Sequence, residues 1–160
     1  MTDWLEHSVQ VEVPTPVEHV WSLWSNLEQM PHWMKWIHSV TLSETDPSLS
    51  VWEMKANSFS FNWRSRILKL QPLQLIQWES VDGLPNRGAI RFYDRKDNSI
   101  VKLTVAYGVP GILVPLMATL SVGSVVESSL KADLERFRDY AIQDYKASQT
   151  TPESSEQPPG

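Results

Sequence analysis

The chain has 160 residues, of which 41% are hydrophobic, and these values predict one globular domain with a substantial core. The formal net charge of −5 argues against nucleic acid as a partner, because nucleic-acid-binding domains present a basic face. The absence of cysteine excludes thiol catalysis, disulfides and thiolate metal sites.

The N-terminal third of the chain predicts a strand followed by two short helices. Hydrophobic and polar residues alternate over residues 5–13, which is typical of a half-buried strand. The sequence Thr15-Pro16-Val17-Glu18 follows, and it predicts a helix in which the threonine is the N-cap and the glutamate completes a capping box. Residues 26–30 predict a second short helical turn, which ends at Pro31.

Six further strands are predicted in the middle of the chain, with turn signals between most of them. They span residues 36–44, 50–56, 59–70, 74–81, 88–94 and 100–107. Because short connections join these strands, we expect an antiparallel sheet.

A long uncharged run separates Lys102 from Glu127 and leads into a C-terminal helix. The run breaks at Gly108-Val109-Pro110-Gly111 and then resumes with apolar residues at steps of three and four, namely Leu116, Leu120, Gly123, Val126, Leu130, Leu134, Phe137 and Ala141. This spacing predicts a helix of roughly 30 residues with one apolar stripe. A helix that covers the sheet is one interpretation of residues 103–126, and a membrane span is another, although prolines and glycines interrupt it. A third interpretation is a helix whose first half lines a cavity or touches a bilayer surface.

The order of the predicted elements is strand, two short helices, six strands and a long helix. This order indicates an α+β fold in which a curved, seven-stranded antiparallel sheet wraps on the C-terminal helix. We expect residues 1–147 to form one domain. Residues 148–160 are rich in Ser, Thr, Pro, Gln and Glu, and we expect them to form a disordered tail. The N-terminus shows no secretory signal, so a cytoplasmic location is expected.

Two segments and the terminal helix resemble the helix-grip superfamily called SRPBCC, which includes START domains, polyketide cyclase/dehydrases and coenzyme-Q-binding proteins. Residues 11–33 read VEVPTPVEHVWSLWSNLEQMPHW, and residues 78–94 read WESVDGLPNRGAIRFYD. The second segment is similar to the cyclase/dehydrase hairpin of cyanobacterial and plastid members. The resemblance covers about residues 5–145. It implies a helix-grip fold with a cavity between sheet and helix that holds an apolar molecule.

Large apolar residues on one phase of the predicted strands are candidates for lining such a cavity. They are Trp52, Met54, Phe59, Phe61, Trp63, Trp78, Ile90 and Phe92. The helix would close the cavity with Leu113, Leu116, Met117 and Leu120. A plain hydrophobic core explains the same pattern, and the sequence leaves both interpretations open. The chain contains eight tryptophans, an unusual number, because each indole needs a large apolar contact.

Two apolar segments are expected at the cavity entrance. One contains Pro110 and Gly111, and the other contains Trp33 and Trp36. Glycines beside proline allow movement, and tryptophans suit a membrane–water boundary. These segments therefore predict a mobile lip that contacts a membrane or a partner protein transiently, with the protein peripheral to that membrane. Packing of both segments as core is the alternative.

No motif for a metal, a nucleotide or a nucleophile is present, so no cofactor and no catalytic residue is predicted. The four histidines, His7, His19, His32 and His38, lack metal-ligand spacing, although His7 shares the inward phase of its strand. Charged residues within the predicted strands fit ion pairs on the outer face or an acid–base pair in the cavity, and these are Glu53, Arg64, Arg66, Glu79 and Arg91.

The function predicted from these features is binding or transport of a hydrophobic small molecule, such as a lipid, an isoprenoid quinone or a pigment. A small polyketide-type cyclase or dehydratase is one alternative. An interaction module with a closed cavity is the other. The sequence does not indicate an oligomeric state.

Overall fold

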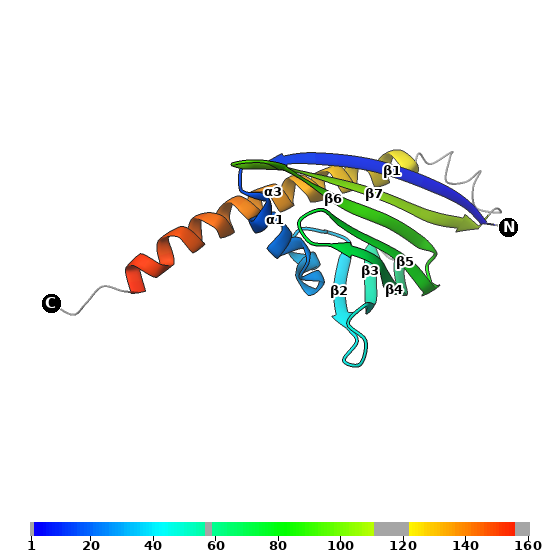
Figure 1. The fold of residues 1–160 in the computed structure, drawn as a ribbon. Helices are drawn as coiled ribbons and strands as arrows, with labels where there is room; N and C mark the ends of the chain where they lie inside the picture. Colours follow the sequence, from blue (N-terminus) through cyan, green and yellow to red (C-terminus); the bar gives the residue numbers. More distant parts are fainter. Residues whose placement is uncertain (1, 57–58, 111–121, 156–160) are drawn as a thin grey trace.

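The computed structural model describes residues 2–56, 59–110 and 122–155. Seven strands and a long C-terminal helix make up most of this part of the chain (Figure 1). The elements are β1 (Thr2–Val13), α1 (Val17–Trp24), the 3-10 helix η1 (Leu27–His32), β2 (Ile37–Leu42), β3 (Leu49–Ala56), β4 (Phe59–Gln71), β5 (Leu75–Gly83), β6 (Asn86–Arg95), β7 (Asn98–Pro110) and α3 (Val122–Ser155).

The strands form one antiparallel sheet in the order β1-β7-β6-β5-β4-β3-β2. Strands β2 to β7 follow one another as hairpins, whereas β1 pairs with β7. The helices α1 and η1 carry the chain from β1 to β2, which lies at the opposite edge of the sheet. The sheet is curved (Figure 1), and the predicted α+β helix-grip fold is confirmed.

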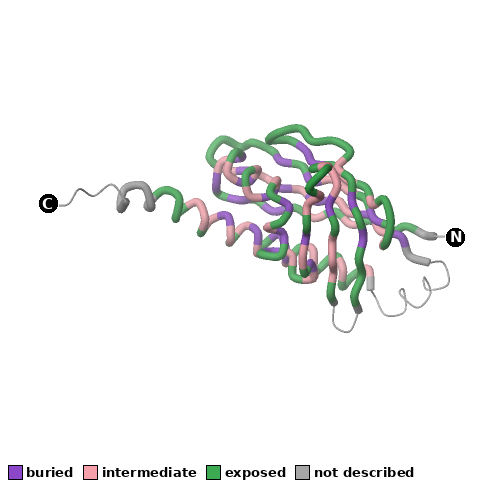
Figure 2. Tube along the Cα trace, turned by 90° about the horizontal axis from the view of Figure 1, so that it is seen from below, coloured by how far each residue is buried: buried purple, intermediate pink, exposed green. Residues whose placement is uncertain are grey.

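The apolar stripe of the C-terminal helix faces the rest of the fold. Leu134, Phe137 and Ala141 are all fully buried, with exposed fractions of 0%. After Ala141 the helix contains no buried residue as far as Gln149, and in Figure 2 this part projects away from the sheet. The part of α3 up to Ala141 therefore packs against the rest of the fold.

An aromatic cluster holds α3 against α1 and η1. The Phe137 ring meets Trp24 and Trp33 edge-on, with ring centroids 4.9 Å apart in both pairs. The ring of Tyr140 lies 5.3 Å from Trp33, and Trp24 lies 5.5 Å from Trp33. Edge-to-face pairs at these distances add attraction beyond the area that they bury. The cluster therefore fixes where the helix crosses the sheet.

Three local features differ from the sequence predictions. The N-cap of α1 is Pro16 and makes no side-chain cap, and the Thr15 hydroxyl has no hydrogen-bond partner in the described part of the chain. Strand β7 continues through the predicted break to Pro110, because Gly108 pairs with Trp4 on β1. The helix α3 extends to Ser155, beyond the end of the domain expected at residue 147, and the disordered tail expected for residues 148–160 stays a prediction.

A membrane-spanning helix was one alternative interpretation of residues 103–126. Residues 103–110 lie in β7 instead, and residues 111–121 fall outside the described residues. Among the helices that the structure describes, none is long and apolar enough to cross a membrane.

The aromatic cluster generates a prediction about stability. Replacing Phe137 with alanine should lower the free energy of unfolding by about 3–5 kcal/mol, because it leaves a cavity between Trp24 and Trp33. Val125 lies on the same helix and is 53% exposed, so Val125→Ala should change it by less than about 0.5 kcal/mol. Urea denaturation of both variants measures the difference. Equal effects would show that the cluster does not anchor the helix.

Candidate functional site

A pocket of about 220 Å³ lies between the sheet and the first half of α3. Its walls are almost wholly apolar, and they come from the sheet, from α1, η1 and the loop after it, and from α3. The lining residues are Trp24, Leu27, Met30, Met34, Trp36, Ile37, Ser50, Trp52, Met54, Trp63, Ser65, Ile67, Ile76, Trp78, Leu84, Asn86, Ile90, Leu103, Val105, Tyr107, Val126, Leu130 and Asp133.

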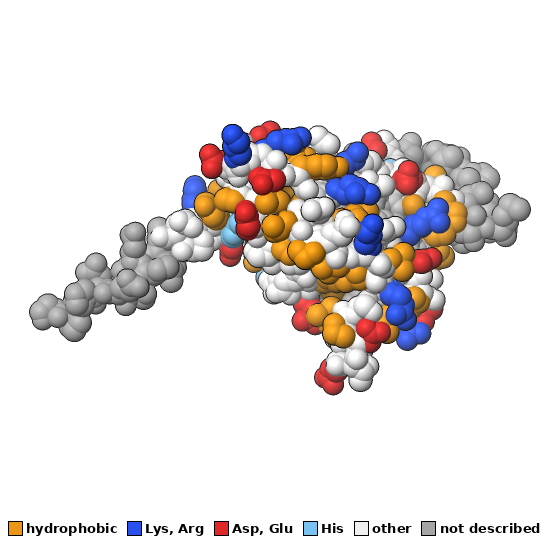
Figure 3. All heavy atoms as spheres, viewed as in Figure 1, with side chains coloured by type: hydrophobic (Ala, Val, Ile, Leu, Met, Phe, Trp, Pro, Cys, Tyr) orange, Lys and Arg blue, Asp and Glu red, His pale blue; other side chains and the backbone are white. Residues whose placement is uncertain are grey.

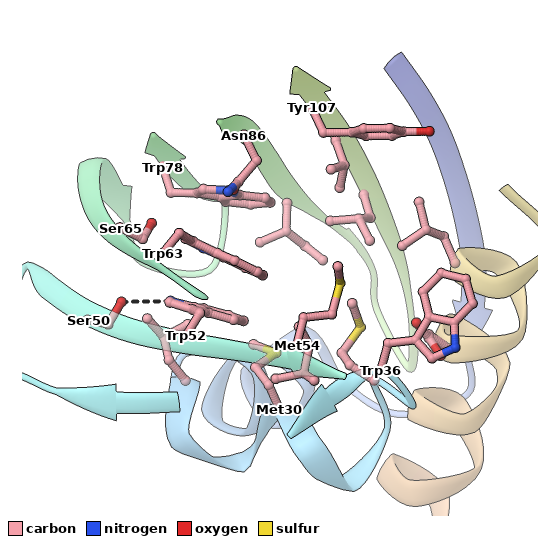
Figure 4. Close-up of a pocket in the computed structure, with 18 of the residues that line it drawn as sticks. Met30, Trp36, Ser50, Trp52, Met54, Trp63, Ser65, Trp78, Asn86 and Tyr107 are labelled. Carbon is pink, nitrogen blue, oxygen red and sulfur yellow. Dashed lines mark hydrogen bonds between the residues drawn. The ribbon is translucent and has the colours of Figure 1, made fainter. Parts of the chain in front are cut away.

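Three indole rings from neighbouring strands form one wall of this pocket (Figure 4). Trp52 on β3 and Trp63 on β4 are directly paired across the strands, and their rings are stacked with centroids 5.9 Å apart and planes 11° apart. Trp78 on β5 extends the row. Trp78 lies against Gly88, where an added Cβ would come within 2.6 Å of the Trp78 ring. Glycine at this position therefore lets the third indole pack closely on the sheet.

The polar edges of two of these indoles bond to neighbouring side chains. The Trp52 Nε1–H donates to the Ser50 hydroxyl at 2.8 Å, and the Trp78 Nε1–H donates to the Asn86 side-chain oxygen at 3.2 Å. The Asn86 amide in turn donates to the Leu84 carbonyl at 2.8 Å. Buried polar groups are costly unless they are paired, so these bonds fix the ring orientations and leave apolar ring surface for the pocket.

Asp133 is the one carboxylate that lines the pocket within the described chain, and its side chain is 5% exposed. It accepts a hydrogen bond from the Lys35 backbone N–H at 3.1 Å and another from the Arg136 guanidinium. Burial raises the pKa of Asp133 above its usual value of 3.8, although the Lys35 N–H and the Arg136 charge oppose this. Its partners therefore stabilise the ionised form only in part.

Tyr107 supplies a hydroxyl at another part of the pocket wall. Its oxygen lies 3.1 Å from Nε2 of His7 on β1, and the two rings are stacked with centroids 5.6 Å apart. Burial raises the pKa of Tyr107 above its usual value of 10.0, so the phenol stays neutral at physiological pH. The predicted inward position of His7 fits this contact.

Most of the strand residues expected in the cavity line the pocket, namely Trp52, Met54, Trp63, Trp78 and Ile90. Phe61 is 39% exposed and is not among the lining residues. Phe92 is buried, but it packs edge-on against Trp21 of α1, because β6 passes under that helix. The Phe59 side chain and residues Leu113, Leu116, Met117 and Leu120 lie outside the described residues.

The expected entrance residues are placed in different surroundings. Trp33 is 1% exposed and packs against Trp24, Phe137 and Tyr140, so it belongs to the core and not to an exposed lip. Trp36 is half-buried and lines the pocket. Pro110 ends β7, its side chain is not described, and Gly111 lies outside the described residues.

The contributions of α1, η1 and the polar lining residues to the pocket were not predicted from the sequence. Trp24, Met30 and Met34 reach the pocket from the segments before β2. Tyr107 and Asp133 could have been found, since Tyr107 shares the phase of Leu103 and Val105, and Asp133 lies beside Leu134 and Leu130 on α3. For Asp133, the available signal was an acidic residue next to the buried apolar stripe of the C-terminal helix.

The charged strand residues lie outside the pocket, and charged side chains of both signs are scattered among hydrophobic ones on the face in Figure 3. Arg64 forms a cross-strand ion pair with Asp82, which confirms the interpretation of that arginine as an outer-face partner. Arg66 lies 3.8 Å from Asp46, and Glu53 lies 3.4 Å from Lys55. In the part of the chain that the structure describes, no cluster of three or more His, Asp or Glu side chains could hold a metal ion.

Comparison with known proteins places this architecture in a family. Residues 13–135 match the family model described as polyketide cyclase / dehydrase and lipid transport. The chain belongs to this family. The resemblance stated from the sequence is therefore confirmed for the superfamily and its cyclase/dehydrase branch.

The individual proteins that this chain resembles are distant from it in sequence. An uncharacterized 17.2 kDa protein of Streptomyces lincolnensis is 24% identical over 81% of this chain and 85% of its own length. The solved structure of TTHA0849 from Thermus thermophilus superposes with a TM-score of 0.75 at 18% identity, over 88% of this chain and 99% of that one. The Zhui aromatase/cyclase of a Streptomyces species also gives 0.75 at 18% identity, over 91% and 98%. The two solved structures show the fold of this chain.

The buried carboxyl of Asp133 predicts a pH dependence of stability. The pKa of Asp133 is higher in the folded protein than in the unfolded chain, so folding takes up a proton at pH values between these two pKa values. The stabilisation that comes from this proton is complete below the pKa of the unfolded chain. The native protein should therefore lose stability relative to Asp133→Asn as the pH rises through the folded pKa, and the difference should then stay constant. Urea titrations from about pH 3.5 to about pH 7 measure it. A difference that changes in the opposite direction would contradict this assignment.

Proposed function

We propose that the protein binds or carries an apolar small molecule in the pocket between the sheet and α3. The observation that supports this most is the wall of stacked indoles, backed by methionines and branched aliphatic residues, around an empty space of about 220 Å³. Protein cores normally fill with side chains, and voids larger than a water molecule are few. An apolar pocket of this size with a few convergent polar groups is the usual form of a ligand site.

The shape of the wall favours a flat ring system. Stacked indoles offer parallel faces, and aromatic faces attract other aromatic faces in offset arrangements. The volume lies below the roughly 300–1,000 Å³ that is usual for drug-sized ligands. The proposed ligand therefore places a ring of quinone or pigment-like character in the pocket, and any long isoprenoid or acyl chain on it extends beyond these walls.

The cyclase alternative receives less support from the pocket. A dehydration that uses general acid–base catalysis needs two groups placed on either side of the reacting carbon atoms. Among the described lining residues the titratable side chains are Asp133 and Tyr107, and Asp133 is already engaged by Lys35 and Arg136. The alternative of a closed interaction module is weakened by the pocket itself.

We also propose a transient contact with a membrane, and Trp36 is the residue that makes it. Trp36 is half-buried and lines the pocket from the segment between η1 and β2, so we propose that ligand enters beside it. Trp33 does not contribute, because it is buried in the aromatic cluster. The acidic net charge of −5 indicates that such contact with an anionic membrane would be hydrophobic and weak.

Binding of naphthalene, a flat apolar probe of two rings, tests the proposal. Trp52→Leu removes one face of the stacked pair while keeping an apolar side chain, so it should raise the dissociation constant roughly fivefold to tenfold through about 1 kcal/mol of lost contact. Equilibrium dialysis measures the constant, and urea denaturation of the same samples measures stability.

Phe92→Leu is the control, because Phe92 is also a large aromatic residue on the sheet but lies outside the pocket; it is buried, whereas Trp52 is only partly buried. It should lower the free energy of unfolding by about 1 kcal/mol and leave the dissociation constant unchanged. The proposal fails if naphthalene does not bind, or if both variants weaken binding equally.

A further inference from the structure

Three side chains from three elements form a polar chain that leads from the pocket to solvent. Tyr107 on β7 lines the pocket, and its hydroxyl points toward β1 (Figure 4). That hydroxyl lies 3.1 Å from Nε2 of His7, and Nδ1 of His7 lies 3.7 Å from Oε1 of Glu127 on α3. The His7 side chain is 11% exposed, whereas that of Glu127 is 59% exposed. The pocket end of the chain is thus partly enclosed, and the carboxylate is open to water.

The carboxylate at one end of this chain selects the tautomer of a neutral imidazole. Glu127 can only accept, so its charge favours placing the imidazole proton on Nδ1, which faces it. Nε2 then carries the lone pair and accepts a hydrogen bond from the Tyr107 hydroxyl. A neutral histidine in this setting therefore turns the Tyr107 O–H away from the pocket, and the lone pairs of the Tyr107 oxygen remain to accept a hydrogen bond.

The other polar groups that line the pocket have different hydrogen-bond partners. The Asn86 oxygen and the Ser50 hydroxyl accept from indole N–H groups, and Asp133 accepts from Lys35 and Arg136. Ser65 is 3% exposed and offers a hydroxyl that can either donate or accept. Among the hydroxyl groups of the described lining residues, that of Tyr107 is therefore the one whose hydrogen-bonding direction is set by partners outside the pocket.

We propose that Tyr107, oriented by His7 and Glu127, accepts a hydrogen bond from a hydroxyl group on the ligand. The ligand class is then a flat, apolar ring that carries a hydroxyl at one edge, such as a phenol or a hydroquinone. This inference rests on the proposed function and adds the polar group that the ligand must bear. Tyr107 is the contact residue, and His7 is a positioning residue that acts through it.

A matched pair of probes tests the inference. The compounds 2-naphthol and 2-methoxynaphthalene share the same ring and the same oxygen, but only the first has a hydrogen-bond donor. At about pH 8, above the range in which histidines usually titrate, the native protein should bind 2-naphthol roughly threefold to tenfold more tightly. Equilibrium dialysis gives both dissociation constants, and their ratio is the readout.

Substitutions assign that ratio to residues. Tyr107→Phe should reduce the ratio to about one while changing the affinity for 2-methoxynaphthalene little, because the ring remains. His7→Leu should give an intermediate ratio, since a freed Tyr107 hydroxyl can also donate to the methoxy oxygen. Tyr93→Phe makes the same chemical change at an exposed tyrosine outside the pocket, so it is the control and should keep the native ratio. Ser65→Ala tests the competing assignment of the preference to the serine hydroxyl. If Tyr107 had only a structural role, Tyr107→Phe would weaken the binding of both probes equally, and the ratio of the two dissociation constants would keep its native value.

Each outcome decides the question. Equal affinity of the native protein for the two probes would overturn the inference and leave the proposed function standing. Loss of the preference in Ser65→Ala with its retention in Tyr107→Phe would overturn it in favour of the serine. Failure of both probes, and of naphthalene, to bind would overturn the inference together with the proposed function.

Discussion

The docking of α3 by Phe137 is the interaction on which the rest of the structure depends. Its ring lies edge-on to the rings of Trp24 and Trp33, with ring centroids 4.9 Å apart in both pairs. These contacts hold the C-terminal helix against the segments that precede β2. The helix is therefore held at one end of the sheet. Its preceding turns, which contain Val126 and Leu130, can then span the sheet without sinking onto it, and the pocket persists beneath them.

The pocket wall follows from the pairing of the strands. Because side chains alternate across a sheet, the register that places Trp52 opposite Trp63 sends both indoles to the same face. The pocket lies between these rings and α3. The indole N–H groups that bond to Ser50 and Asn86 lock the rings in place. Stacking, register and satisfied polar atoms thus produce a rigid apolar surface.

Much of the fold could be predicted from the sequence, because it depends on periodicity. The alternation in residues 5–13 and the stripe that ends at Ala141 specify a strand and a buried helix face whatever the details of packing. The site was less predictable. Trp33 and Trp36 are close in sequence, yet Trp33 packs into the aromatic cluster of the core, whereas Trp36 lies outside that cluster and lines the pocket. Phe92 has the phase of a lining residue, but α1 covers it.

The central claim is that an apolar molecule occupies the space beneath α3. Each tryptophan gives one indole N–H signal in a two-dimensional ¹H–¹⁵N NMR spectrum, and the eight tryptophans divide into two groups. Trp24, Trp36, Trp52, Trp63 and Trp78 line the pocket, whereas Trp4, Trp21 and Trp33 do not. Titration with naphthalene should shift the signals of the first group and leave those of the second unchanged. Shifts that are absent, or confined to Trp4, Trp21 and Trp33, would contradict this account.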